Sequence, residues 1–359
     1  MTDDHRGAVT SERRGDERIV ALDVARTVAI VGMVAVNVGP TGVPGWAGSV
    51  YNLPHGRASV LFVLLAGVGL SMLTRRVRGP RGREYRPRTW LVVAWRAALV
   101  LVIGLVLQLL DHGSDVILVT YAVLFAVGGL VMAASDRVLL VAAGLAVVAG
   151  PLLWMWLGTG DVSPAPDLLM TPVEAARSAV LTGPYPVVTW LAPFLFGMWL
   201  GRRDLGDRPT QWRLAAWGLG ITVGAAVVSA LGAAAFYDPD GEPFPGLLVT
   251  SAAHGQMPLW LVGSAASAVA VVGVALLLGD ELARPWARPL VATGQLALTI
   301  YVGHLLVLAA LRPLPHTLTQ GYALSALIVV GAVAGATAWR IGIGRGPLES
   351  LLRPPRRRR

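Results

Sequence analysis

Long apolar runs alternate with short polar segments along almost the whole chain of 359 residues. A bilayer core of about 30 Å needs roughly 20 consecutive, mostly apolar residues in a helix. Ten windows reach or approach that length: Ile19–Val38, Arg57–Thr74, Trp90–Leu110, Val116–Ala134, Val138–Leu157, Pro186–Gly201, Leu214–Phe236, Gln256–Gly279, Leu290–Leu311 and Gly321–Arg340. The pattern predicts an all-α, polytopic membrane protein. Because the sixth window is short and contains Pro193, nine spans with one re-entrant segment is the alternative.

The composition agrees with this pattern. Apolar residues make up 55% of the chain and charged residues 14%, whereas a soluble domain carries about a quarter charged residues. Disordered, collagen-like and nucleic-acid-binding proteins are therefore excluded. Cysteine is absent, which rules out disulfides, thiolate metal sites and cysteine nucleophiles. No two histidines have the i, i+3 or i, i+4 spacing of a helical metal site, so we expect neither a metal nor a resident cofactor.

The arginines indicate the orientation. All 30 basic residues are arginine, and with ten spans all but five of them fall on the side of the termini. Positively charged loops stay in the cytoplasm. We therefore expect a multi-pass protein of the cell membrane with both termini cytoplasmic. Residues 1–18 would form a polar tail, residues 19–340 one membrane domain, and residues 341–359 a basic tail on anionic headgroups.

Ionisable residues inside spans mark the candidate sites, because each costs about 2.5–3.5 kcal/mol on insertion scales. Asp23 and Arg26 share one face of the first span at i, i+3 spacing, and Arg96 lies in the cytoplasmic third of the third span. Together they predict a charged cytoplasmic mouth. The structural alternatives are a self-neutralising pair near the interface and an arginine that extends to the headgroups.

A second set of polar residues lies toward the outer ends of the spans or along the ninth: Asn37, His55, His254, Gln295, Tyr301 and His304. For any single histidine the plain alternative is a hydrated side chain without a chemical role. His55, at the outer end of the second span, stands apart because of the sequence around it.

The segment 18–37, RIVALDVARTVAIVGMVAVN, resembles the opening span of the heparan-alpha-glucosaminide N-acetyltransferase-like proteins and of related bacterial multi-span acyltransferases. Asp23, Arg26, Met33 and Asn37 match that pattern, whereas Thr27 replaces the family's glycine after the arginine. The second span, HGRASVLFVLLAGVGLSM, resembles the family's histidine-bearing span. Later blocks resemble the bacterial branch in the same order: GSDVILVTYAV, GPYPVVTWLAPFLFGMWLGR, AAHGQMPLWLVGS and GQLALTIYVGHLL.

The resemblance implies an acyltransferase-like domain over residues 19–340. Such an enzyme takes an acyl group, usually acetyl, from cytoplasmic acyl-CoA and delivers it to an acceptor at the far face. The resemblance makes His55 the catalytic residue, either as a general base or as a carrier of the acyl group. The hydrogen-bond donors expected beside the oxyanion are Asn37, Gln295 and Tyr301, and the histidines next in line are His254 and His304. Arg26 and Arg96, beside Asp23, suit the CoA phosphates.

The expected partners are the bilayer, acyl-CoA, and an amine or hydroxyl acceptor such as a sugar; a homodimer is compatible with the sequence. Two other functions remain open. A secondary transporter would share the many spans and polar interior but would show broken helices near the midplane. A noncatalytic membrane scaffold would not need His55.

Overall fold

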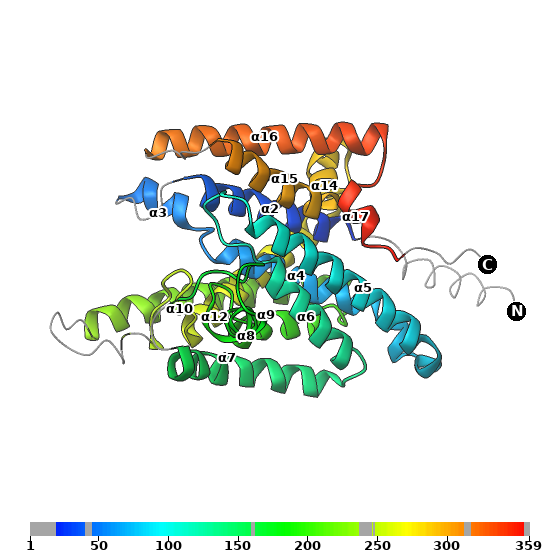
Figure 1. Cartoon of the computed structure of the whole chain (residues 1–359), viewed down its shortest axis with the longest axis horizontal. Coiled ribbons are helices and arrows are strands. Elements are labelled where there is room, and N and C mark those ends of the chain that lie inside the picture. The colour runs from blue at the N-terminus through cyan, green and yellow to red at the C-terminus, as the bar shows by residue number, and fades with distance from the viewer. Residues whose placement is uncertain are drawn as a thin grey trace, which may run out of the picture.

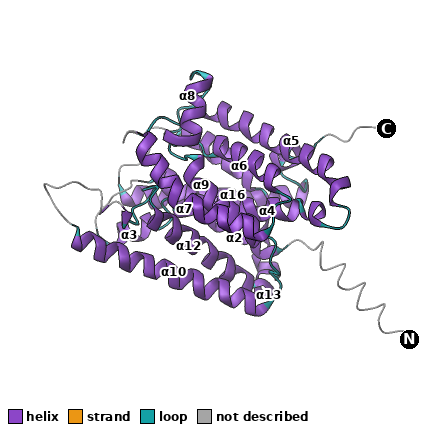
Figure 2. Cartoon of the chain, turned by 90° about the horizontal axis from the view of Figure 1, so that it is seen from below, coloured by secondary structure: helices purple, strands orange, loops and turns teal. Residues whose placement is uncertain are grey.

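The computed structural model describes residues 19–39, 45–158, 162–236, 246, 248–311 and 317–354. The predicted tail 1–18 and the last residues of the basic tail, 355–359, lie outside this part. The described residues are arranged in helices, and they contain no strand (Figure 2).

Every apolar window coincides with a helix or with a bent pair of helices. The principal helices are α2 (Val20–Val38), α4 (Arg57–Leu73), α5 (Gly82–Gln108), α6 (Leu118–Val131), α7 (Asp136–Gly158), α9 (Val187–Leu200), α10 (Arg208–Ala235), α12 (Pro258–Leu277), α14 (Arg288–Gln295), α15 (Ala297–Ala310) and α16 (Leu318–Gly342). The shorter ones are α3 (Trp46–Asn52), η1 (Arg75–Arg78), α8 (Pro172–Arg177), the π-helical turn η2 (Ser178–Thr182), α13 (Gly279–Leu282), η3 (Pro285–Ala287) and α17 (Pro347–Leu351).

Among the described residues, seven helices are long and apolar enough to cross a membrane, and two bent pairs raise that number to nine. The pair α8/η2 and α9 is bent by 59°, and the pair α14 and α15 by 71°. The short helix α6 lies in the remaining apolar window. An all-helical chain of this kind is compatible with a multi-pass membrane protein, while the count of ten spans stays a prediction.

The helices form an inner group and an outer group. About two thirds of the apolar windows of α2 and α4 are buried (61% and 67%), whereas only 17% of those of α10 and α16 are. In Figure 1, α16 and α7 lie along opposite sides of the molecule with α2, α4 and α9 between them. The outer helices leave large apolar side chains exposed, among them Leu91, Leu145, Trp217 and Leu327. Hydrocarbon suits such surfaces and water does not.

Small residues let the inner helices approach closely. A Cβ atom at Gly67 of α4 would overlap the carbonyl oxygen of Phe194 in α9, and one at Gly197 of α9 would overlap the carbonyl oxygen of Leu64 in α4. Only glycine fits at these two positions, a mode of contact typical of membrane helices. This contact fixes α4, and His55 lies in the turn that precedes this helix.

The C-terminal segment is part of the fold. The Glu349 carboxylate accepts hydrogen bonds from the backbone N–H groups of Leu298 and Thr299 (2.8 and 3.0 Å) and from the Thr299 hydroxyl (2.6 Å). Trp95 Nε1 of α5 donates to the carbonyl of Leu351 at 2.7 Å. The segment around α17 therefore caps the first turn of α15, at one end of the molecule, and α3 lies toward the other (Figure 1).

Candidate functional site

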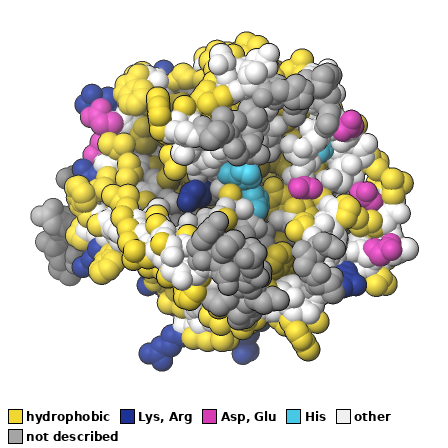
Figure 3. Space-filling model, turned by 90° about the vertical axis from the view of Figure 1, so that its left-hand side faces the viewer, with side chains coloured by type: hydrophobic (Ala, Val, Ile, Leu, Met, Phe, Trp, Pro, Cys, Tyr) yellow, Lys and Arg dark blue, Asp and Glu magenta, His cyan; other side chains and the backbone are white. Residues whose placement is uncertain are grey.

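Two histidines meet in a recess at the end of the molecule away from α17. His55 lies in the turn that precedes α4, and His254 lies in the loop that precedes α12. Their ring centroids are 5.2 Å apart with an interplanar angle of 66°, an edge-on contact. Both side chains are half-buried. Figure 3 shows histidine side chains inside a hollow of this face.

Aromatic rings form the wall of this recess around His254. The ring of Trp260 stacks on His254 at 6.0 Å, and the rings of Tyr185 and Trp190 lie at 5.6 and 6.2 Å. The indole N–H groups of Trp190 and Trp260 are buried and have no hydrogen-bond acceptor in the described part of the chain. The wall of the recess is therefore largely apolar, and this low polarity strengthens electrostatic contacts beside it.

The loop that carries His254 has an unusual backbone. His254 and Gln256 both have positive φ angles, 56° and 55°, and are the non-glycine residues of this kind in the described structure. Such conformations cost about 1–3 kcal/mol each and persist only where contacts hold them. Gln256 supplies those contacts, because its Oε1 accepts from Thr189 Oγ1 (2.8 Å) and its Nε2 donates to the carbonyl of Pro184 (3.2 Å).

Burial and the nearby charge of His55 lower the pKa of His254 to about 4. His254 is therefore neutral at pH 7 and keeps a lone pair that can accept a proton or a hydrogen bond. Burial has the opposite effect on a carboxylic acid, and it raises the pKa of Asp115 in the loop between α5 and α6, while His112 opposes the rise.

Tyr185 belongs to the wall of the recess, because its ring lies 5.6 Å from that of His254 and 5.1 Å from that of Trp190. Tyr121 of α6 has a buried hydroxyl without a hydrogen-bond partner among the described residues.

At the opposite end of the molecule a charged cluster surrounds Asp23. Arg26 Nη1 lies 2.6 Å from Asp23 Oδ1, and Gln295 Nε2 donates to Asp23 Oδ2 at 3.2 Å. Arg340 Nε donates to Gln295 Oε1 at 2.5 Å. Gln295 is the last residue of α14, so this cluster lies beside the bend between α14 and α15. The predicted pair of Asp23 and Arg26 is thus present, with Gln295 and Arg340 added to it.

The remaining sequence candidates fall into other groups. Arg96 Nε donates to the carbonyl of Leu352 at 3.4 Å, so its hydrogen bond goes to the C-terminal segment and not to Asp23. The Asn37 amide lies 3.1 Å from His304 Nε2 and not beside His55. The rings of Tyr301 and His304 are 5.2 Å apart. Gln295, grouped from sequence with the outer residues, lies with the Asp23 cluster instead.

Sequence reasoning gave no role to Tyr185 or the tryptophans of the recess. Gln256 was visible only as a polar residue that opens an apolar window next to His254. The contact between His55 and His254 joins residues far apart in the chain, and no local pattern encodes it.

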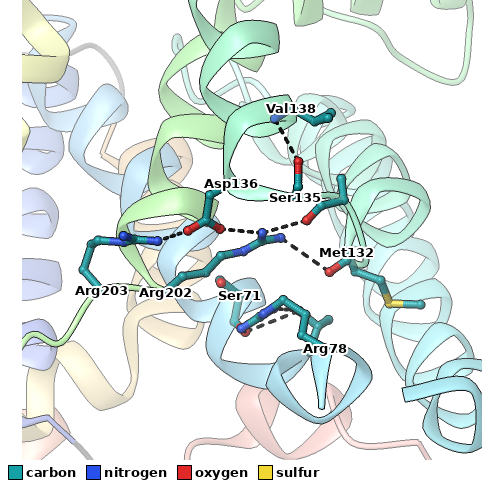
Figure 4. A network of polar contacts seen from close by, with 10 residues as sticks. Ser71, Arg78, Met132, Ser135, Asp136, Val138, Arg202 and Arg203 are labelled. Carbon is teal, nitrogen blue, oxygen red and sulfur yellow. Dashed lines mark hydrogen bonds and ion pairs between the residues drawn. The ribbon is translucent and has the colours of Figure 1, made fainter. Parts of the chain in front are cut away.

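A third polar group joins three turns at the arginine-rich end (Figure 4). Arg202 Nη1 donates to Asp136 Oδ1 (2.8 Å) and to the carbonyl of Ala134 (2.7 Å), and Arg203 pairs with the same carboxylate. Arg78 Nη2 donates to the carbonyl of Ser71 at 3.0 Å. Burial and the charge of Arg202 lower the pKa of Arg78 to about 10. The bonds of Arg202 and Arg203 fasten the end of α9 to the turn between α6 and α7, whereas the bond of Arg78 stays within the turn that follows α4.

No group of three or more histidine, cysteine or acidic side chains that could hold a metal ion occurs among the residues that the structure describes.

Residues 202–355 match the model of a family described as "Protein of unknown function (DUF418)". The match covers His254, Gln295, Tyr301 and His304, and it leaves out His55 and Asp23. It does not reach the first two spans, which carry much of the resemblance to the acyltransferases. No curated protein matches the chain.

Proposed function

We propose that the protein is a membrane acyltransferase that moves a short acyl group from cytoplasmic acyl-CoA to an amine or hydroxyl in the outer recess. The observation that carries this proposal is the contact of His55 with His254 in an aromatic recess, with the Asp23 cluster at the opposite end of the molecule. Transfer of an acyl group from cytoplasmic CoA to an acceptor at the far face requires a base near the acceptor and cations near the CoA phosphates.

The chemistry assigned to the recess is a direct transfer. An imidazole removes the proton of the acceptor O–H or N–H group, and the acceptor atom attacks the thioester carbonyl carbon. The carbon–sulfur bond then breaks, and the proton passes to the departing thiolate to give CoA-SH. His55 is the base in this proposal, and the neutral His254 orients the ring of His55 through their edge-on contact.

The oxyanion of the tetrahedral intermediate needs donors that are already in place. The rings of Tyr185 and Trp190 lie beside His254, and their O–H and N–H groups are the donors proposed for this role. An acyl-His55 intermediate is the alternative route, and it uses the same residues. At the inner end, Arg26 and Arg340 are the cations proposed to receive the CoA phosphates. Arg96 donates to the carbonyl of Leu352 in the C-terminal segment.

The test uses purified protein in nanodiscs with acetyl-CoA and glucosamine, and it follows free thiol with a chromogenic reagent. Because the chain has no cysteine, the protein itself contributes no thiol. His55→Ala should lower CoA release by about 10²-fold or more, as expected for loss of a general base or nucleophile. The thermal unfolding midpoint should stay near that of the parent protein. Unchanged release in both His55→Ala and His254→Ala would refute the proposal.

One observation favours a secondary transporter as the second candidate. The two bent helix pairs resemble the broken spans that form transporter binding sites. Flux of a recess ligand into liposomes without acetyl-CoA, undiminished by His55→Ala, would decide for this function.

A further inference from the structure

A strongly basic segment joins α4 to α5. Residues 75–88, RRVRGPRGREYRPR, contain seven arginines against one acidic residue, Glu84, which gives this stretch a net charge of +6. The polar segment 1–18 contains five acidic residues against four arginines, so its net side-chain charge is only −1. Segment 1–18 can therefore balance little of the charge of residues 75–88, and this charge attracts anions from outside the chain.

The turn between η1 and α5 forms the floor of an open recess of about 350 Å³. The lining residues are Val77, Gly79, Pro80, Arg81, Gly82, Arg83 and Glu84. The Gly82 N–H donates to the carbonyl of Gly79 at 2.9 Å, and a Cβ atom at Gly82 would overlap the carbonyl oxygen of Val77. Glycine at this position thus permits the tight turn. The volume of the recess is in the range of sites that hold small molecules.

Positive charge borders this recess. Arg81 and Arg83 line it and are exposed, so their guanidinium groups can be reached from outside. Glu84 is the acidic residue of the lining, and the two arginines outnumber it. Arg76 of η1 lies over the ring of Tyr85 in α5, with its Cζ 6.0 Å from the ring centroid, and this contact holds η1 against α5. An anionic oxygen group between the two lining arginines matches this arrangement.

The recess lies just past the end of an apolar helix. α4 ends at Leu73, and η1 begins at Arg75. Trp90, two turns beyond Arg83 in α5, is 41% exposed, and exposed indoles of membrane proteins lie at the level of the lipid headgroups. In Figure 1 this end of α5 projects from the neighbouring helices. In a bilayer the headgroups, and not the hydrocarbon chains, are therefore the part nearest the recess.

We infer that the recess over residues 77–84 binds the headgroup phosphate of an anionic phospholipid. Arg81 and Arg83 receive the phosphate oxygens through their forked N–H groups. The other arginines of residues 75–88 add to the attraction, because each basic residue near the surface strengthens binding to anionic lipid. A zwitterionic headgroup carries its own ammonium group, which the same arginines repel. The inference rests on the membrane location of the chain and not on acyl transfer.

The test is native mass spectrometry of the full chain in detergent with equal amounts of phosphatidylglycerol and phosphatidylcholine that have the same acyl chains. The parent protein should retain phosphatidylglycerol about tenfold or more over phosphatidylcholine. The double variant Arg81→Gln/Arg83→Gln should lower this preference roughly tenfold, as expected for the loss of two basic residues near an anionic headgroup. Equal retention of the two lipids by the parent would overturn the inference.

Gly79→Leu separates the recess from the charge. Gly79 has a φ of −80°, which any residue adopts, and a Cβ atom there would lie 3.5 Å from the carbonyl oxygen of Arg76, an ordinary contact. The leucine side chain should occupy part of the recess while every arginine stays in place. The preference should fall as it does in the double variant, and a preference that persists undiminished in both would refute the site.

Arg137→Gln/Arg213→Gln is the matched control. Both arginines are exposed and belong to the arginine-rich side, and neither lines the recess. This variant removes the same charge and should keep the preference; an equal loss would show that overall charge, and not the recess, selects the lipid. Glycerol 3-phosphate at millimolar concentration should not displace phosphatidylglycerol, and full displacement would assign the recess to a soluble phosphate instead.

This inference and the proposed function fail separately. In nanodiscs of phosphatidylcholine, the double variant Arg81→Gln/Arg83→Gln should release CoA at the rate of the parent, because neither arginine belongs to the proposed transfer site. A protein that prefers phosphatidylglycerol through Arg81 and Arg83 but never releases CoA would refute the acyltransferase and leave the lipid site intact. CoA release by a parent protein that retains both lipids equally would do the reverse.

Discussion

Gln256 holds the strained backbone that presents His254. Replacing it with alanine removes the bonds to Thr189 and Pro184 and leaves their buried polar atoms without this partner. We expect Gln256→Ala to lower the free energy of unfolding by about 1–3 kcal/mol and to reduce CoA release through displacement of His254. Thermal unfolding followed by circular dichroism measures the first effect. Gln320→Ala, at an exposed glutamine of α16, is the control and should change neither quantity.

The low pKa of His254 makes stability depend on pH in a definite direction. In the unfolded chain a histidine has a pKa near 6.5, and in the folded protein that of His254 is about 4. Between these values the unfolded state binds more protons, so the contribution of neutral His254 is complete above pH 6.5 and is lost as pH falls to 4. His254→Gln should flatten the fall of the unfolding midpoint over this interval. A slope equal to that of the parent would contradict the assignment.

At the scale of helices, the contact between α4 and α9 depends on the absence of side chains. Gly197→Leu would drive carbon atoms into the backbone of Leu64, and overpacking of this kind costs about 1–3 kcal/mol or more. We expect loss of the monodisperse peak in size-exclusion chromatography. Gly144 of α7 has no neighbour near a built Cβ atom, so Gly144→Ala should be neutral or should stabilise the fold by about 0.5–1 kcal/mol.

Glu349 caps α15 with a carboxylate, which also interacts well with the positive end of the helix dipole. Glu349→Gln keeps the shape of the side chain but removes the charge, and we expect a loss of about 1 kcal/mol in the free energy of unfolding. Glu281→Gln removes a carboxylate from an exposed i, i+3 ion pair with Arg284, and it should change the free energy of unfolding little. Equal losses of unfolding free energy in the two variants would show that the Glu349 cap stabilises the fold no more than an exposed ion pair does.

The positions of the helices could be predicted from sequence because each window has the length and apolarity that a bilayer demands. The bends could not. Leu296, at the bend between α14 and α15, lies inside a continuous apolar window without proline. The bend arises where Glu349 satisfies the N–H groups of a new helix start, and that contact comes from a segment about 50 residues later in the chain.

At the scale of the whole molecule, the arginine distribution predicts that η1 and the loop before α12 lie on opposite sides of the membrane. The chain without cysteine allows a direct test. Arg81→Cys and Ala252→Cys both lie at exposed positions. A membrane-impermeant maleimide applied to intact cells should label Ala252→Cys alone, and Arg81→Cys should react only after permeabilisation. Labelling of both in intact cells would refute the orientation.

The candidate site was predictable only in part. His55 could be found from the sequence around it, and the Asp23–Arg26 pair from its helical spacing. The partners of these residues could not, because His254, Gln295 and Arg340 reach them through tertiary packing.

The ion pair inside α2 also bears on how the chain is made. Gly294 and Gln295, which pack against Asp23, leave the ribosome about 270 residues after it, roughly 15–50 s later at usual rates of synthesis. During that interval the first helix lacks its contacts with α14. Arg26, one turn away in the same helix, already neutralises Asp23. The newborn helix thus carries its own counter-ion until its final neighbours are synthesised.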